Sequence, residues 1–515
     1  MKVVNRLTIL ILAFVLGLLL APAATAGLIV GTPIDVIGNL PAAQFIANGY
    51  GTNTYKDWGN EPFVAVNPTN PNDVFVSSFA YNTSSTTRGA NVFYSINGGT
   101  SWTSQFTIPS PANGLTIPND WTFAYNSAGV LHGSILGGGN IYQGATANPT
   151  SLAAWSYTGG GAPINTVSRG TSDQPWIALQ GTNVFVAYDA FQAGFVNPTE
   201  HVTASGNNGT TFPIDNPISN GAQSNSVNPG TRIATDNAGN VYSIFGVGTP
   251  TVTPGVNNVT YYLNRSRNGG VTWDFLGSSV IGGITIDSGV STQLCNSCTQ
   301  ASNNWFANVN DLRGNITAIA PDKTGSHVYV LIGKQDATGT DRIYLVAYQA
   351  VGNALNKLSE IVVSPAAQRA ALPAITVKDD GTVVLMYETY NAQDGKVHVH
   401  VASSDDFGAS INSDIEEYAF TPLTLLQATG SVSSNREFGD YDFLTSNGDT
   451  FYGVFAGLGD VNVDGINTTG LIDPFFFSGT DAVPEPDSLA LLSAALLGLG
   501  CFVRKQGARL TRRSV

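Results

Sequence analysis

Residues 231–245 read TRIATDNAGNVYSIF, two short apolar runs joined by a turn that contains Asp, Asn and Gly. Alternating apolar positions around such a turn are typical of a β-hairpin. Six further segments have the same form, at 62–78, 121–135, 175–188, 317–332, 373–387 and 442–455. The chain therefore contains a repeated β unit rather than a set of unrelated strands.

The spacing of the hairpins indicates the size of the repeat. The first residues after the turns are Val74, Val130, Val184, Val241, Val328, Val383 and Phe451. They lie 56, 54, 57, 87, 55 and 68 residues apart, and about 55 residues are enough for one four-stranded blade with its connections. The pattern predicts an all-β fold, a six- or seven-bladed β-propeller. We expect the final hairpin to share strands with the first, and residues 473–477 to supply one closing strand, because closure removes exposed sheet edges.

A second motif follows four of the hairpins, 21, 21, 25 and 21 residues after the first residue of the second strand. Its form is S-x-D/N-x-G-x-S/T followed by an aromatic or apolar residue. The residues that carry it are Ser95, Asn97, Gly99 and Trp102; Ser205, Asn207, Gly209 and Phe212; Ser266, Asn268, Gly270 and Trp273; and Ser404, Asp406 and Gly408. The motif resembles the Asp-box, or BNR repeat, of sialidases and related propellers. Turn chemistry favours a structural role, since Asn or Asp accepts backbone N–H bonds and Gly supplies a positive φ.

Composition and charge restrict the classes of ligand. Only 11% of the residues are charged, 57 are Gly, and the formal net charge is −14. Residues 1–26 hold two basic groups and residues 504–515 hold five, with no acidic group in either segment, so the body between them is more acidic than the whole chain. An acidic body with scattered Lys and Arg argues against a nucleic-acid partner.

The N-terminal segment predicts export. Lys2 and Arg6 precede an apolar run over 7–20, and Ala24 and Ala26 stand where a signal peptidase would require small residues. A basic region, a short apolar region and an A-x-A site are the three parts of a secretory signal. We therefore expect a signal peptide over 1–26, in a helical segment, and a propeller domain over 27–480.

The C-terminal segment, 481–515, has a different order of features. Val483, Pro484, Glu485 and Pro486 precede an apolar segment, a predicted helix over about 488–503, and then a basic cluster. This order resembles the PEP-CTERM sorting signal of Gram-negative bacteria. The resemblance implies an exosortase-type processing enzyme as partner, transient contact with the inner membrane through the helix, and a final place in the cell envelope, on the surface or in the extracellular matrix. The basic cluster is expected to stay cytoplasmic.

Cysteines and acidic turns suggest two small sites. Cys295 and Cys298 form a lone CxxC without a second ligand pair, which favours a disulfide in an exported chain over zinc binding or a redox role. Asp460, Asn462 and Asp464 begin a Ca²⁺-type loop, but its twelfth position is Leu471. Ca²⁺ is thus the one candidate cofactor, and a plain turn is the alternative. His398 and His400 share a strand face without a third ligand nearby.

Candidate functional residues lie just before or at the start of the inner strands. They are Glu61, Asp120, Asp173, Arg232, Arg369 and Asp440, with Tyr441 and Asp442 beside the last. Strand beginnings in a propeller converge on one mouth of the central channel, where ligands usually bind. Paired carboxylates there are able to support hydrolysis of a glycosidic bond; the alternative is that these side chains only cap strand ends.

The Asp-box resemblance implies a sialidase-like site with an arginine triad, a Tyr nucleophile and an Asp acid/base. The first blade reads Glu61-Pro62-Phe63-Val64 and lacks the expected arginine, and the spacing yields no triad. The leading hypothesis is a non-catalytic surface propeller that binds or organises envelope polysaccharide. The alternatives are a sialidase-like glycoside hydrolase and a protein-interaction scaffold.

Overall fold

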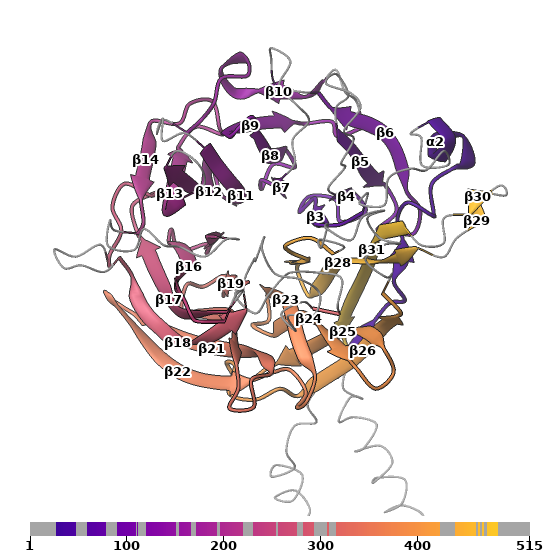
Figure 1. Cartoon of the computed structure of the whole chain (residues 1–515). Coiled ribbons are helices and arrows are strands. Elements are labelled where there is room, and N and C mark those ends of the chain that lie inside the picture. The colour runs from indigo at the N-terminus through magenta and orange to yellow at the C-terminus, as the bar shows by residue number, and fades with distance from the viewer. Residues whose placement is uncertain are drawn as a thin grey trace, which may run out of the picture. The chain divides into compact units, whose positions relative to one another are not determined.

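The computed structural model describes residues 27–47, 59–78, 90–109, 111, 120–150, 154–165, 171–192, 196–219, 230–253, 256–275, 282–292, 306–307, 316–422, 438–459, 462–463, 466–467 and 471–482. Residues 30–480 belong to one compact unit. Across these described ranges, seven antiparallel sheets are arranged as blades around a common centre, as Figure 1 shows. The predicted β-propeller is confirmed, and the blade number is seven.

Six blades have four strands in chain order from the centre outward. Blade 1 contains β3 (Phe63–Val66), β4 (Val74–Ser77), β5 (Ala90–Ser95) and β6 (Thr103–Ile108). Blade 2 contains β7 (Trp121–Tyr125), β8 (Leu131–Gly137), β9 (Asn140–Thr146) and β10 (Ser156–Tyr157). Blade 3 contains β11 (Thr171–Gln180), β12 (Asn183–Gln192), β13 (Val196–Ser205) and β14 (Ile214–Pro217).

The next three blades have longer strands. Blade 4 contains β15 (Arg232–Thr235), β16 (Val241–Pro250), β17 (Val256–Ser266) and β18 (Ile284–Thr292). Blade 5 contains β19 (Ala318–Pro321), β20 (His327–Gln335), β21 (Asp341–Val351) and β22 (Ala354–Val362). Blade 6 contains β23 (Arg369–Val377), β24 (Val383–Asn391), β25 (Lys396–Ser404) and β26 (Ser413–Phe420).

Blade 7 closes the ring with strands from both ends of the chain. It contains β27 (Phe443–Asn447), β28 (Thr450–Gly459), β31 (Leu471–Asp481) and β1 (Leu28–Val30), and β2 (Ile34–Asp35) also pairs with β31. The predicted closing strand, 473–477, lies inside β31, where Phe475 and Phe476 face Asp35 and Ile34 in the register. This prediction is confirmed.

Small elements complete the described chain. These are the helix α2 (Ala42–Ala47), the 3-10 turn η3 (Thr158–Gly160), and the hairpin of β29 (Asn462–Val463) and β30 (Ile466–Asn467). The helices predicted within the signal and sorting segments lie outside the described residues. No helix among the described residues is both long enough and apolar enough to cross a membrane.

The inner hairpins form because their turns satisfy their own backbone. In blade 4, the Asp236 carboxylate accepts N–H bonds from Ala238 and Asn240 at 2.8 and 2.9 Å. Gly239 takes φ +101° in that turn, a region in which a side chain would be strained. The alternating apolar residues on either side then pack between blades: Tyr329 and Leu345 of blade 5 share one cluster with Ile375 and others of blade 6.

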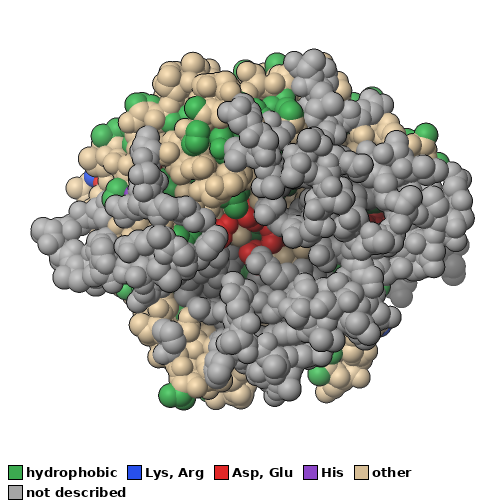
Figure 2. Space-filling model, turned by 45° about the horizontal axis from the view of Figure 1, so that its top comes forward, with side chains coloured by type: hydrophobic (Ala, Val, Ile, Leu, Met, Phe, Trp, Pro, Cys, Tyr) green, Lys and Arg blue, Asp and Glu red, His purple; other side chains and the backbone are tan. Residues whose placement is uncertain are grey.

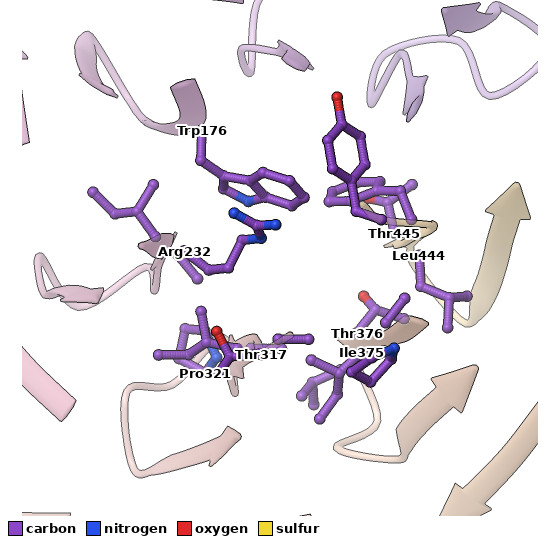
Figure 3. A pocket seen from close by; sticks show the side chains of 18 of the residues that line it. Trp176, Arg232, Thr317, Pro321, Ile375, Thr376, Leu444 and Thr445 are labelled. Atoms are coloured by element: carbon purple, nitrogen blue, oxygen red, sulfur yellow. The ribbon is translucent and has the colours of Figure 1, made fainter. Parts of the chain in front are cut away.

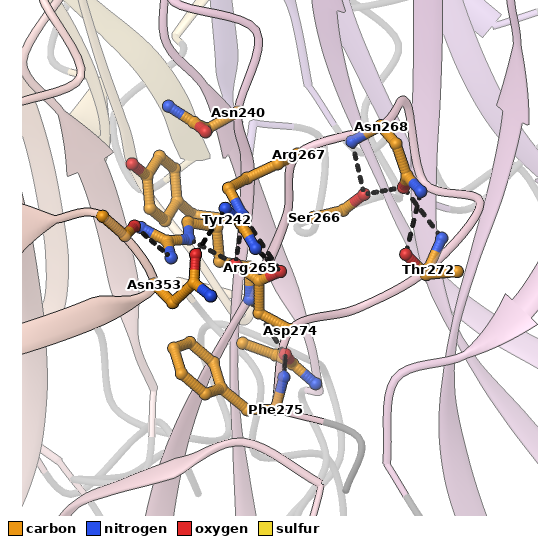
Figure 4. Close-up of polar contacts among 12 residues, drawn as sticks. Asn240, Tyr242, Arg265, Ser266, Arg267, Asn268, Thr272, Asp274, Phe275 and Asn353 are labelled. Carbon is orange, nitrogen blue, oxygen red and sulfur yellow. Dashed lines mark hydrogen bonds and ion pairs between the residues drawn. The ribbon is translucent and has the colours of Figure 1, made fainter.

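The four Asp-box turns connect the third and fourth strands of blades 1, 3, 4 and 6. In blade 4, Ser266 Oγ accepts the Gly270 N–H at 2.9 Å. Asn268 Oδ1 accepts the Thr272 N–H at 2.9 Å, as Figure 4 shows. The same bonds recur in the other three turns. Each turn packs its central glycine against the preceding blade, with Gly270 beside Ala204 and Phe185 of blade 3. These hydrogen bonds stabilise each turn, and the glycine contacts pack it against the neighbouring blade.

Candidate functional site

Four polar side chains meet where the inner strands begin, and we call this group the acidic end of the channel: Glu61, Asp120, Gln174 and Asp440. They precede β3 and β7, lie in β11, and precede β27, so they come from blades 1, 2, 3 and 7. All four are at most 8% exposed. Figure 2 shows Asp and Glu side chains gathered in a central hollow of the face that comes forward.

Gln174 joins the carboxylates of two other blades. Its Nε2 donates to Asp440 Oδ2 at 3.0 Å and to Asp120 Oδ1 at 3.3 Å. Glu61 Oε1 accepts the backbone N–H of Asp440 at 3.1 Å, and a side-chain hydrogen bond links Glu61 with Asp120. The acidic end is therefore a connected hydrogen-bond network and not a set of independent strand caps.

The backbone is strained where it presents these side chains. Glu61 has φ 52° and Gln174 has φ 50°, and a proline follows each of them. A non-glycine residue in the left-handed region costs about 1–3 kcal/mol, and such residues cluster at functional sites. Gly439, at φ +79°, has no side chain because a Cβ would lie 3.0 Å from the Glu61 carboxyl carbon and closer still to its Cγ. The fold thus holds Glu61 tightly against the Asp440 segment.

Burial and like charge change the protonation of the network. Burial raises the pKa of Asp120 well above its ordinary value, and the nearby Glu61 and Asp173 raise it further. The raised pKa extends the pH range over which Asp120 is protonated, and in that form the carboxyl is able to donate a hydrogen bond or a proton. Burial also raises the pKa of the Tyr441 hydroxyl, with Glu61 and Asp120 as further causes. Tyr441 therefore remains a neutral phenol.

Arg232 lies next to this network, below two aromatic rings. Its guanidinium carbon is 4.1 Å from the ring centre of Trp176 and 5.7 Å from that of Tyr441. Burial lowers the pKa of Arg232, while Tyr441, Asp189 and Asp440 oppose that shift. Arg232 supplies the compensating positive charge for the buried acids and a cation–π contact with Trp176.

The structure brings most of the predicted residues together. Asp173 lies close enough to raise the pKa values of both Asp120 and Asp189. Asp442 stands apart: its Oδ1 accepts the Ala456 N–H at 3.1 Å, and its carboxyl contacts Glu388. Arg369 begins β23 and pairs with Tyr390 of β24. Their functional roles stay predictions.

Sequence reasoning missed Gln174 and a second pair of acids. Gln174 precedes Pro175 as Glu61 precedes Pro62, at the same phase of the repeat, and that recurrence was the available signal. Asp189 and Glu200 are fully buried and hydrogen-bonded to each other. Burial raises the Asp189 pKa well above its ordinary value, with Glu200 as the next cause.

The resemblance to sialidases implies a triad of arginines, which can be sought among the arginines that the structure describes. Arg265 and Arg267 both bind Asp274, and Arg342 binds Asp336, the first two in the network of Figure 4. Arg232 contacts residues of the acidic end and the adjoining Tyr441. Within the described ranges, Arg265, Arg267 and Arg342 therefore have other partners and do not complete a triad with it.

Several predictions fall outside the described residues. These are the signal peptide over 1–26, Cys295 and Cys298, Asp460 and Asp464, and Val483, Pro484, Glu485 and Pro486. Asn462, the remaining member of the predicted Ca²⁺ loop, lies in β29. Across the part of the chain that the structure describes, no group of three His, Cys, Asp or Glu side chains is placed to hold a metal ion.

Comparison with known proteins yields matches only among solved structures. No protein-family model and no curated protein matches this chain. The α-L-arabinanase of Penicillium chrysogenum complexed with arabinobiose has a TM-score of 0.44 at 10% identity, covering 88% of this chain and 99% of that chain. The polysaccharide lyase Uly1 has 0.45 at 8%, covering 84% and 90%. The GH93 α-L-arabinofuranosidase of Fusarium graminearum with arabinobiose has 0.42 at 8%, covering 87% and 97%. Likenesses at these values carry no argument about function.

Proposed function

We propose that this chain is an exported, envelope-associated propeller that binds extracellular polysaccharide at the acidic end of its channel without cleaving it. The observation that carries the proposal is the bridge from Gln174 Nε2 to Asp120 and Asp440. It gathers the Gln174 amide, the Asp440 side chain and the Asp120 carboxyl, whose pKa is raised, at one point. Sugar hydroxyls both donate and accept hydrogen bonds, and such a mixed set of donors and acceptors is suited to them.

The charge of the acidic end limits the class of saccharide. Among the described residues, Glu61, Asp173 and Asp440 surround Asp120, and Arg232 is the cation that interacts with Asp120 and Asp440. An anionic sugar would add charge to an acidic, water-poor space, which is costly. The proposed ligand is therefore a neutral or amino-substituted glycan rather than a uronate or a sialylated chain.

Export and envelope placement are part of the same proposal. They are supported by the three-part signal over 1–26 and by the Pro-Glu-Pro, apolar and basic order over 484–513. Processing by an exosortase-type enzyme would leave the propeller in the extracellular matrix, where polysaccharide is abundant. Fractionation of cells that express the full chain tests this: a protein retained in the cytoplasm at its full length would contradict it.

A glycan array tests the binding proposal directly. We expect the purified protein to bind neutral or amino-sugar oligosaccharides, and the variants Asp440→Asn and Gln174→Leu to lose at least tenfold in affinity. Asp405→Asn, at an exposed acid in the blade 6 Asp-box turn, is the matched control and should bind normally. Binding that survives both site variants, or a preference for anionic glycans, would contradict the proposal.

A glycoside hydrolase is the second candidate, favoured by one observation. Asp120, whose burial raises its pKa, lies in one network with Asp440, and an acid beside a carboxylate is the pair that glycoside hydrolysis uses. A screen with fluorogenic glycosides separates the two candidates. Turnover that disappears in both Asp120→Asn and Asp440→Asn would establish hydrolysis at this end.

A further inference from the structure

A second space lies further along the channel, beyond the side chains of the acidic end. It is a cavity of about 230 Å³ lined by residues of β11, β15, β19, β23 and β27 and by residues just before these strands (Figure 3). Arg232, Thr317 and Tyr441 are buried on its side nearest the strand beginnings, whereas Thr235 and Thr445 are half-buried at the turn side. The cavity therefore opens toward the hairpin turns, which we call the turn end of the channel.

The walls of this cavity combine aliphatic side chains with polar groups in equal measure. Ile233, Ile316, Ala318, Ile375 and Leu444 line it. An apolar cavity of about 150 Å³ is able to hold a benzene ring, so this one has room for a small organic group. The aliphatic side chains favour an apolar body in the ligand.

Two buried polar atoms in the wall lack hydrogen-bond partners among the described residues. They are Arg232 Nη2 and Thr317 Oγ1, on residues that are 2% and 4% exposed. Figure 3 shows both side chains at the cavity, Arg232 beneath Trp176. An unsatisfied buried donor costs about 1–3 kcal/mol, and an oxygen acceptor placed in the cavity would remove that cost.

The surrounding charges indicate a neutral acceptor. The Arg232 guanidinium already interacts with Asp189, Asp440 and Asp120. Lys323, at the turn end, forms an ion pair with Asp379 of blade 6. A carboxylate would therefore lose its hydration in a partly apolar space where the Arg232 charge is already balanced by other carboxylates. A carbonyl oxygen accepts a hydrogen bond from the same Arg232 donor without the cost of burying a charge.

We propose that the turn end of the channel is a second binding site, distinct from the acidic end, which takes a neutral acyl group. Its carbonyl oxygen accepts from Arg232 Nη2, Thr317 Oγ1 forms the second hydrogen bond, and its alkyl portion packs on Ile375 and Leu444. The ligand class is an N-acylated or O-acylated compound, inserted with the acyl group first.

Saturation-transfer NMR tests the site with small probes. N-methylacetamide should receive saturation from the protein, and acetate at the same concentration at least fivefold less. Thr445→Phe, which fills the open end, should abolish the N-methylacetamide signal, whereas Thr445→Val leaves the opening free and should retain it. Thr317→Val, of the same shape, should weaken binding about fivefold, as expected for the loss of one hydrogen bond.

The opposite outcomes overturn the proposal. They are no saturation of N-methylacetamide, equal saturation of acetate, or a signal that survives Thr445→Phe in a protein that still unfolds cooperatively. Gln174→Leu should leave the probe signal unchanged while it removes saccharide binding, because Gln174 bonds Asp120 and Asp440 and does not line the cavity. The failure of one site is thereby distinguishable from the failure of the other.

Discussion

The Asp-box turn of blade 1 offers a sharp test of how the ring is held closed. Gly99 donates its N–H to Ser95 Oγ at 2.8 Å and has φ +89°. A Cβ at this position would lie 2.6 Å from Cδ1 of Phe476, in the closing strand β31, and nearer still to its Cε1. Trp102 of the same turn packs edge-on against Phe476, with ring centres 5.1 Å apart. Gly99→Ala should therefore destabilise the closure itself.

Its neighbour Gly98 supplies the matched control. Gly98 has φ +71°, and a Cβ there would meet only Asn72 Oδ1, at 3.7 Å. Alanine in the left-handed region costs about 1–2 kcal/mol at either position, and overpacking adds about 1–3 kcal/mol. We expect the free energy of unfolding to fall by about 1–2 kcal/mol in Gly98→Ala and by about 2–5 kcal/mol in Gly99→Ala.

Urea unfolding followed by tryptophan fluorescence measures both variants. Adding Phe476→Leu to Gly99→Ala should recover part of the loss, because the smaller side chain frees the space that the methyl group needs, so the two changes should not be additive. Equal losses in Gly98→Ala and Gly99→Ala, or strict additivity with Phe476→Leu, would refute the assignment of this turn as a contact across the closure.

Three further predictions concern buried charges. Burial lowers the pKa of His132 to about 4. Neutral His132 therefore leaves the free energy of unfolding unaffected above about pH 6.5, and that free energy falls by about 3 kcal/mol as the pH drops from 6.5 toward 4. His132→Gln should abolish this decrease when unfolding is measured as a function of pH. The raised pKa of Asp189, caused by burial and Glu200, means that stability is lost as the pH rises above about 4; Asp189→Asn should melt higher than the parent at pH 8, with the difference disappearing near pH 4. Asp274→Ala leaves the buried Arg265 without its 2.8 Å partner and should cost about 3 kcal/mol in urea unfolding, a loss that Asp274→Glu should partly avoid.

The repeat was readable from the sequence because each blade encodes its inner hairpin locally. The Asp236 to Gly239 turn and its flanking apolar residues need no partner from elsewhere in the chain to be recognised. The sequence did not distinguish six blades from seven, because blade 7 contains β31 and β1, which come from opposite ends of the chain. One strand boundary differs from the prediction: Val130, predicted as the first strand residue, lies one position before β8.

The acidic end was only partly predictable. Asp120, Arg232 and Asp440 were found because polar residues at strand beginnings share one mouth of a propeller. Gln174 was missed because the candidate residues were chosen by charge and an amide is uncharged. Its hydrogen-bond partners, Asp120 and Asp440, are 54 and 266 positions away in the sequence. The contact with Asp440 joins blade 3 to blade 7 and depends on the closure of the ring, which no local pattern encodes.

A crystal structure of the protein with the best array glycan would test the central claim most directly. We predict a sugar ring at the acidic end, with hydroxyl groups within hydrogen-bond distance of Gln174 and Asp440. A glycan bound on the outer strands, or one that leaves both of these side chains without contact, would contradict the account.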